Sequence, residues 1–181
     1  MRQELDQNRA LGARIAGRAE IEDVRLMRSS FVFEKIPTGN LRLGWTLDVR
    51  PSTEFVPNGN HFIVKCDYTV AVDELDGDGK GARVTSIEFT MAALYELEFS
   101  DADSAPSGDE MTAFGASTGA FALYPYARAY VQDVSARLGL PPLTLGMYRI
   151  PISDPESALS KTPKSSVAAK ARGARPRSGK A

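Results

Sequence analysis

The chain has 181 residues, of which 43% are hydrophobic and 25% charged, and its formal net charge is −1. These values are typical of a globular protein that buries a core. No apolar run reaches the roughly eighteen residues of a membrane-spanning helix, so we expect no membrane insertion. A single cysteine, Cys66, excludes an internal disulfide framework and, together with a charged N-terminus without an apolar signal core, favours a cytoplasmic location.

Charge is distributed unevenly along the chain. Residues 151–181 hold seven Lys or Arg and two Asp or Glu, a net charge near +5, whereas residues 1–150 are near −6. This tail lacks aromatic residues and is rich in Ser, Pro and Ala, so we predict that it is disordered. A basic tail can contact the phosphates of nucleic acid. Nothing in it would read or stack on bases, so we expect a solubilising tail and no nucleic-acid partner.

The N-terminal part predicts a short helix followed by strands. Residues 3–18 carry a weak apolar stripe of Leu5, Leu11 and Ile15, which two glycines weaken further. Residues 19–36 form the first strand-like run, and their mixed alternation predicts a bulge that exchanges the faces of the strand.

Three further runs alternate between apolar and polar residues and predict strands. Their apolar positions are Leu41, Leu43, Trp45, Leu47 and Val49; Phe62, Val64, Cys66, Tyr68, Val70 and Val72; and Ile87, Phe89, Met91, Ala93, Tyr95, Leu97 and Phe99. The connectors PTGN, VPNGN and DELDGDGKG combine Gly with Asn or Asp, as hairpin turns do. We therefore expect an antiparallel meander of consecutive strands, with one buried and one solvated face.

A long helix follows at Ser107. The sequence SGDE predicts a capping box, with Ser107 as N-cap and Glu110 three positions later. Gly115 and Gly119 lie one helical turn apart, and such small residues predict a close approach to the sheet. Pro125 should kink or restart the helix.

The second half of this helix has its own apolar stripe. Tyr126, Tyr130, Val134 and Leu138 follow one another four residues apart, and we assign them to the core and to contacts between subunits. A C′ glycine at Gly139 and the following double proline should end the helix. The expected fold is therefore α+β: a four-stranded antiparallel meander packed with a long kinked C-terminal helix, plus a short N-terminal helix.

The sequence concentrates no catalytic or metal-binding group. The one histidine, His61, stands at a strand start, where we expect an ordinary surface residue, and Cys66 lies on the apolar face of its strand. The loop DGDGKG lacks the oxygen ligands that a calcium loop needs at its fifth and twelfth positions. We therefore expect no enzyme activity, no metal and no cofactor.

The segment FALYPYARAYVQDVSARLGLPPLTL, residues 121–145, resembles the signature helix of the SecB family of export chaperones. In that family a Phe/Tyr-Pro-Tyr-Ala-Arg motif opens a long helix, and a Leu/Phe-Pro-x-Leu-x-Leu stretch follows, here LPPLTL. The upstream run EIEDVRLMRSSFVFEKIP looks like the family's first strand. The similarity extends from Ala19 to Leu145.

The resemblance implies an ATP-independent holdase that is a homotetramer. In the family two subunits join their sheets into one of eight strands, dimers pair through the long helices, and grooves between helix and sheet bind extended apolar stretches of unfolded clients. Exporting members also engage the motor ATPase, a further partner that the resemblance suggests.

Three departures point to a subgroup. The connector PTGN is short, MYRIPISDPESAL is too rich in proline for a second apolar helix, and the N-terminal helix is an addition. These features are similar to the SecB-like chaperones of actinobacterial toxin–antitoxin systems, whose client is the antitoxin rather than a preprotein for export.

We accordingly divide the chain into an N-terminal helix (1–18), a SecB-like chaperone domain (19–150) and a disordered basic tail (151–181). The candidate client-binding residues are Phe31, Phe33, Leu43, Trp45, Met111, Phe114, Phe121 and Tyr124. The alternative is a small-molecule binding or catalytic module with a closed pocket between sheet and helix. A third hypothesis is a nucleic-acid-associated protein that acts through its tail.

Overall fold

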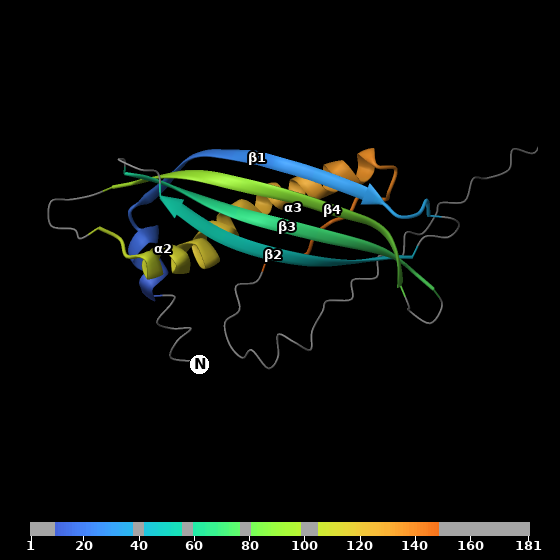
Figure 1. Ribbon diagram of the computed structural model, residues 1–181, viewed down its shortest axis with the longest axis horizontal. Coiled ribbons are helices and arrows are strands. Elements are labelled where there is room, and N and C mark those ends of the chain that lie inside the picture. Colours follow the sequence, from blue (N-terminus) through green and yellow to red (C-terminus); the bar gives the residue numbers. More distant parts are fainter. Residues whose placement is uncertain (1–9, 38–41, 56–59, 77–80, 99–104, 149–181) are drawn as a thin grey trace, which may run out of the picture.

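The computed structural model describes residues 10–37, 42–55, 60–76, 81–98 and 105–148. Residues 10–16 form a helix that precedes a sheet, and one long helical segment then lies on one face of that sheet (Figure 1). The elements in chain order are β1 (Ala19–Phe33), β2 (Leu43–Phe55), β3 (His61–Leu75), β4 (Gly81–Leu97), α2 (Gly108–Phe114), the π-helical η1 (Gly115–Gly119) and α3 (Ala120–Arg137). The predicted tail at 151–181, together with Leu5, Leu41 and Phe99, lies outside the described residues.

The sheet has four antiparallel strands, as expected, but its order is β1-β4-β3-β2. The expected hairpin between the first two strands is therefore wrong, because β1 pairs with β4 and lies at the opposite edge from β2. Only β2, β3 and β4 form a meander, and β1 completes a Greek-key order. Nine residues separate Phe33 from Leu43. At about 3.3 Å per extended residue, they can cross the three strand spacings of about 4.8 Å between the edges.

The predicted faces of the strands are confirmed. The apolar positions of β3 and β4 are buried against the helices, and Leu43 of β2 is buried with them, while Trp45, Leu47 and Val49 are half-buried. The expected bulge is also present, since the register of β1 against β4 shifts twice, between Ile21 and Asp23 and between Leu26 and Arg28.

The helix starts and stops where the sequence predicts. Ser107 Oγ accepts a hydrogen bond from the Glu110 N–H at 3.2 Å, and the Glu110 carboxylate accepts one from the Ser107 N–H at 2.8 Å. At the other end Gly139 has φ +75°, and the Gly139 and Leu140 N–H groups donate to Ala136 and Ser135 carbonyls. This is a Schellman motif, in which a left-handed residue lets the last carbonyls find donors.

The irregularity in the helix lies earlier than Pro125. Pro125 is accommodated inside α3, and the interruption is the π-helical turn η1, which contains both glycines that predicted a close approach. A Cβ atom added at Gly115 would lie 2.2 Å from Thr53 Oγ1, and one added at Gly119 would lie 2.8 Å from Val64 Cγ1. The close approach is confirmed, because only glycine leaves room for the sheet at these two positions.

The N-terminal helix packs on the start of α2. Ile15 is fully buried, Arg14 forms an ion pair with Glu110 at 2.7 Å, and a Cβ atom at Gly12 would lie 3.1 Å from the Ala113 carbonyl oxygen. This helix thus contributes to the same core as the sheet.

Candidate polypeptide-binding surface

The long helical segment crosses the sheet diagonally. α2 and η1 contact β2, η1 also contacts β3, and α3 contacts β3 and β4. Near its end α3 reaches β1, where the hydroxyls of Tyr130 and Ser29 form a hydrogen bond. The diagonal course covers the two central strands and leaves much of each edge strand uncovered (Figure 1).

An apolar row on β1 faces the helix side of the sheet without being covered. Ile21, Leu26 and Phe31 pair with Tyr95, Met91 and Ile87 of β4, which are buried on that side. Residues paired in this way project from the same face. Even so, Ile21 and Leu26 are each 45% exposed and Phe31 51% exposed. Together with Phe33, which is also exposed and faces the same way, we call these residues the β1 apolar row.

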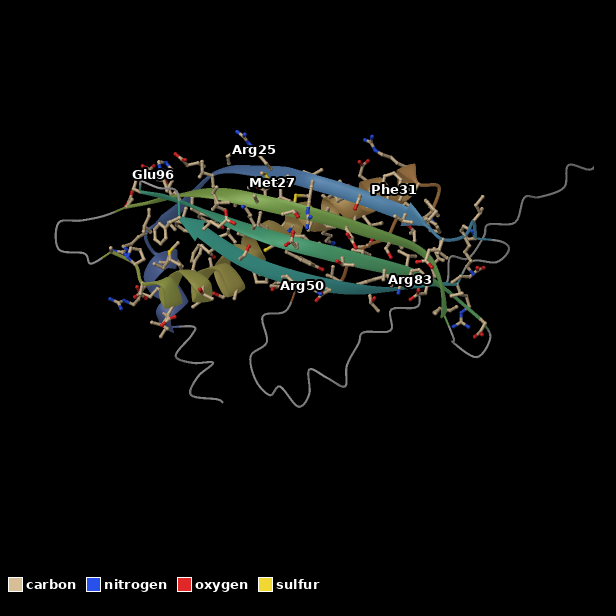
Figure 2. The ribbon with its side chains drawn as sticks, in the orientation of Figure 1. Arg25, Met27, Phe31, Arg50, Arg83 and Glu96 are labelled. Atoms are coloured by element: carbon tan, nitrogen blue, oxygen red, sulfur yellow. The ribbon has the colours of Figure 1, made fainter. Side chains whose placement is uncertain are left out.

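The backbone edge of β1 is open as well. β1 ends the strand order, and no strand in the described part of the chain pairs with its outer edge. Met27, which lies in the second bulge (Figure 2), adds exposed apolar surface, and Val32 is exposed as well. A long apolar edge of this kind can add a further strand, with main-chain hydrogen bonds supplied by the edge and side-chain contacts by the row.

The other edge strand, β2, is different. Pro51 removes a main-chain donor in its middle, and Asp48 and Arg50 place charge beside the edge. Both features protect an edge from pairing. On the helix side, however, Trp45 and its neighbours Leu47 and Val49 are half-buried against the margin of the core.

The segment after α3 folds back along that helix. Tyr124 donates a hydrogen bond from its hydroxyl to the Gly146 carbonyl at 2.6 Å, and the Leu143 N–H donates to Ser135 Oγ at 2.8 Å. The Tyr148 ring contacts the Tyr124 ring at 5.0 Å, while Leu143 and Leu145 are buried. The LPPLTL stretch thus packs along α3 and covers one side of it.

The opposite face of the sheet is polar. Arg28 donates to Thr90 at 2.8 Å and pairs with Asp67 at 3.1 Å, and Arg83 pairs with Asp73 at 2.6 Å. The hydrogen bond from Thr90 and the nearby Arg28 hold the pKa of the Asp67 carboxyl below its usual value. Apolar polypeptide would gain little by displacing water from these charges, so the helix side of the sheet is the better candidate for an apolar binding surface.

The eight predicted client-binding residues differ in their exposure to solvent. Phe31, Phe33 and Phe121 are exposed, the last at 55%, and Trp45 is half-buried. The other four are buried within the chain: Leu43, Met111, Phe114 and Tyr124. Phe114, for example, contacts the rings of Phe62 and Tyr95 edge-on at 5.4 and 5.2 Å. Spacing along a helix or strand could not separate these residues, because it does not show which of its faces other elements cover.

Only part of the stripe from Tyr126 to Leu138 faces the core. Val134 is buried, Tyr130 and Leu138 are half-buried, and Tyr126 is 49% exposed. Tyr126 is therefore not part of the core of the single chain, and its assignment to a contact between subunits stays a prediction. The buried face of α3 instead comprises Ala120, Leu123, Tyr124, Ala127, Val131, Val134 and Ser135.

Sequence reasoning missed Ile21 and Leu26 as members of the β1 apolar row. The mixed alternation of this strand predicted a bulge, but a bulge shifts every later side chain to the other face. Only the observed pairing with β4 shows that these two residues share a face with Phe31.

Comparison with known proteins identifies the fold. The sequence matches no protein-family model. It is 35% identical over 152 residues to the SecB-like chaperone Rv1957 of Mycobacterium tuberculosis strain H37Rv, across 78% of this chain and 84% of the relative. The SecB-like chaperone MT2006 of strain CDC 1551 matches equally well. The solved structure of Rv1957 in complex with a ChAD peptide from the Rv1956 HigA1 antitoxin superposes with a TM-score of 0.70 at 34% identity, over 79% of this chain and 99% of that one.

This chain thus shares its fold with a chaperone whose structure has been solved with a bound peptide. The chain belongs to the family of SecB-like chaperones. Within the described ranges, no helix has the length and apolar composition required to span a membrane.

Proposed function

We propose that this SecB-like chaperone is an ATP-independent holdase whose client is the antitoxin of a toxin–antitoxin system. The support is the solved relative, which carries an antitoxin peptide and matches this chain at 34% identity over nearly its whole length. We also propose a cytoplasmic location, because the single cysteine is buried and free, as is usual in a reducing compartment.

The β1 apolar row supports subunit pairing. Its members Ile21, Leu26 and Phe31 are spaced evenly, since their partners on β4 are residues 95, 91 and 87. An antiparallel pairing of two β1 edges about a two-fold axis at Leu26 would bring Ile21 of one copy beside Phe31 of the other. A two-fold interface requires such self-complementarity. We assign the β1 edge to this contact, which would join two sheets into one of eight strands within a homotetramer.

With β1 occupied by a second copy, we assign the client surface to two of the predicted residues that remain accessible. Trp45 is a half-buried aromatic residue of β2, and Phe121 is one of the exposed aromatic residues of α3. Each presents apolar area that an extended peptide can bury, worth roughly 25 cal/mol per Å² before entropy costs. The assignment of the client surface to these residues is supported by their accessible apolar area.

Peptide binding tests the client surface. An antitoxin C-terminal peptide is titrated into the wild type and into Trp45→Ser and Phe121→Ser. Full burial of one aromatic side chain contributes about 1.5–3 kcal/mol, and a client can bury only the exposed half of these two, so each change should weaken the affinity roughly 3- to 10-fold. Met147→Ser is the matched control, because Met147 is an 84% exposed apolar residue outside the proposed surface. Unchanged affinity in both serine variants would place the client elsewhere.

Mass in solution tests the assembly. Four chains of 19.6 kDa should give a particle of roughly 80 kDa. Leu26→Asp places a charge at the centre of the β1 contact and should reduce that mass at least by half. Thr46→Asp, which adds the same charge to an exposed position of the β2 edge, should leave it unchanged. An intact tetramer in Leu26→Asp would exclude the β1 interface.

A further inference from the structure

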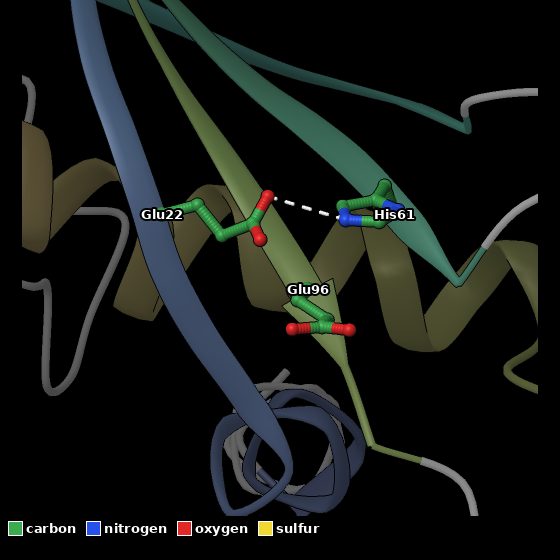
Figure 3. Close-up of side chains that lie close together, drawn as sticks. All are labelled: Glu22, His61 and Glu96. Atoms are coloured by element: carbon green, nitrogen blue, oxygen red, sulfur yellow. Dashed lines mark ion pairs between the residues drawn. The ribbon is translucent and has the colours of Figure 1, made fainter.

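The only histidine of the chain lies close to two carboxylates that come from two other strands of the sheet. Glu22 of β1, His61 of β3 and Glu96 of β4 each offer one ligand atom, and these atoms all lie within 4.8 Å of one another. Figure 3 shows the Glu22 carboxylate directed at the imidazole ring, with Glu96 rising from the strand between them. His61 Nε2 is 3.2 Å from Glu22 Oε2.

The sheet register builds this cluster. His61 and Glu96 are direct partners across β3 and β4, so their side chains project from the same face. Glu22 lies in the first bulge of β1 and has no partner residue on β4. Bulges re-aim side chains in this way, and here the carboxylate reaches across β4 to the histidine.

A neighbouring amide holds one of the carboxylates in place. Asn60 donates a hydrogen bond from its side-chain nitrogen to Glu96 Oε1 at 2.8 Å. Hydrogen bonds of this kind orient the ligands of metal sites and tune their affinity. Asp23, the acidic residue next to Glu22, is paired with Arg25 instead and does not belong to the cluster.

The three groups match the requirements of a transition-metal ion. One imidazole nitrogen with two carboxylate oxygens is a ligand set for Zn²⁺, whereas Mg²⁺ and Ca²⁺ prefer oxygen alone. A tetrahedral ion with bonds of about 2.0–2.1 Å keeps its ligand atoms roughly 3.3 Å apart. The His61–Glu22 distance already has this value, and rotation of partly exposed side chains can bring Glu96 to it. The imidazole binds a metal ion as a neutral ligand. The two ionised carboxylates together carry two negative charges, which one divalent cation neutralises.

We propose that Glu22, His61 and Glu96 form a three-ligand site for a divalent transition-metal ion of the Zn²⁺ type on the polar face of the sheet. The fourth coordination position is open to water or to a group from a binding partner. A bound ion links β1 to β3 across β4, and so holds the bulged start of the edge strand in register. This site lies on the face opposite the proposed client surface and does not depend on that proposal.

Zinc titration of the full chain tests the site directly. Because His61 is the only histidine, its imidazole NMR signals report this position without ambiguity. Zn²⁺ should shift these signals with saturation at one ion per chain, and excess Mg²⁺ should not compete. Glu22→Gln and Glu96→Gln replace a charged ligand by an isosteric amide, and each should weaken Zn²⁺ binding by about 10-fold or more.

A control variant separates the site from general charge effects. Glu88→Gln removes an exposed carboxylate of β4 that lies on the same polar face but outside the cluster, and should bind Zn²⁺ like the wild type. The thermal unfolding midpoint should rise with Zn²⁺ in the wild type and in Glu88→Gln, but not in His61→Gln. Imidazole signals that do not respond to Zn²⁺ would overturn the proposal. So would equal affinity in all three glutamate variants, which would leave His61 as the partner in an ordinary ion pair with Glu22.

Discussion

The close approach of the helix to the sheet at Gly115 predicts a specific steric coupling with Thr53. A methyl group at Gly115 would lie 2.2 Å from Thr53 Oγ1, so one of the two must move by about 1 Å to reach ordinary contact. Such overpacking costs typically 1–3 kcal/mol. Alanine also gains about 1 kcal/mol over glycine within a helix. Gly115→Ala should therefore lower the free energy of unfolding by up to about 2 kcal/mol.

Removing the obstructing oxygen should reverse the sign. In Thr53→Ala the nearest remaining Thr53 atom is its Cβ, which would lie 3.6 Å from the new methyl group, an ordinary contact distance. Gly115→Ala made in that background should be neutral or stabilising by up to about 1 kcal/mol. The resulting coupling energy is about 1–3 kcal/mol. Thr53 also donates to the Met111 carbonyl at 3.2 Å, and any weakening of this hydrogen bond by the displaced hydroxyl is part of the measured coupling energy.

Urea unfolding at one protein concentration, followed by circular dichroism and by the fluorescence of the single tryptophan, measures these differences. Gly108→Ala is the matched control, because nothing lies within 4 Å of a Cβ atom there and the change should not destabilise. Thr53→Val, which retains a methyl group near the position of the oxygen, should keep the penalty. An equal loss from Gly115→Ala in the wild-type and Thr53→Ala backgrounds would refute the steric explanation.

Three further changes test other parts of the fold. Ser107→Ala removes the side-chain half of the capping box and should cost about 1 kcal/mol in chemical unfolding. Tyr130→Phe loses the hydroxyl contact with Ser29 but keeps the ring against Phe89, and should cost about 1 kcal/mol, whereas Tyr126→Phe at an exposed position should cost close to nothing. Burial raises the pKa of the Cys66 thiol from 9.0 to about 11 and that of Tyr95 from 10.0 to about 12. The unfolded chain then releases these protons first, so the free energy of unfolding should fall as pH rises above about 9 for Cys66 and above about 10 for Tyr95, by up to about 1.4 kcal/mol per pH unit for each group. Cys66→Ala should make this decline shallower between pH 9 and 11, and an unchanged slope would contradict the assigned burial of the thiol.

Local chemistry of the chain determined most of the secondary structure and the family. Alternation defined β2, β3 and β4, because a half-buried strand needs apolar residues at every second position. Ser107, Glu110 and Gly139 marked the helix ends, because unpaired backbone groups there require particular residues. The paired glycines at 115 and 119 indicated close packing, and the segment 121–145 indicated the SecB-like family.

Only the tertiary structure decided the strand order, the exposed face of β1 and the cluster around His61. Turn residues show that a chain reverses direction, but they do not show which strand the next one pairs with, so the hairpin expected between β1 and β2 was wrong. The two bulges of β1 change the facing of its side chains in a way that only the partner strand reveals. Glu22, His61 and Glu96 are far apart in sequence and meet because their strands are neighbours in the sheet, a long-range pairing that no local pattern encodes.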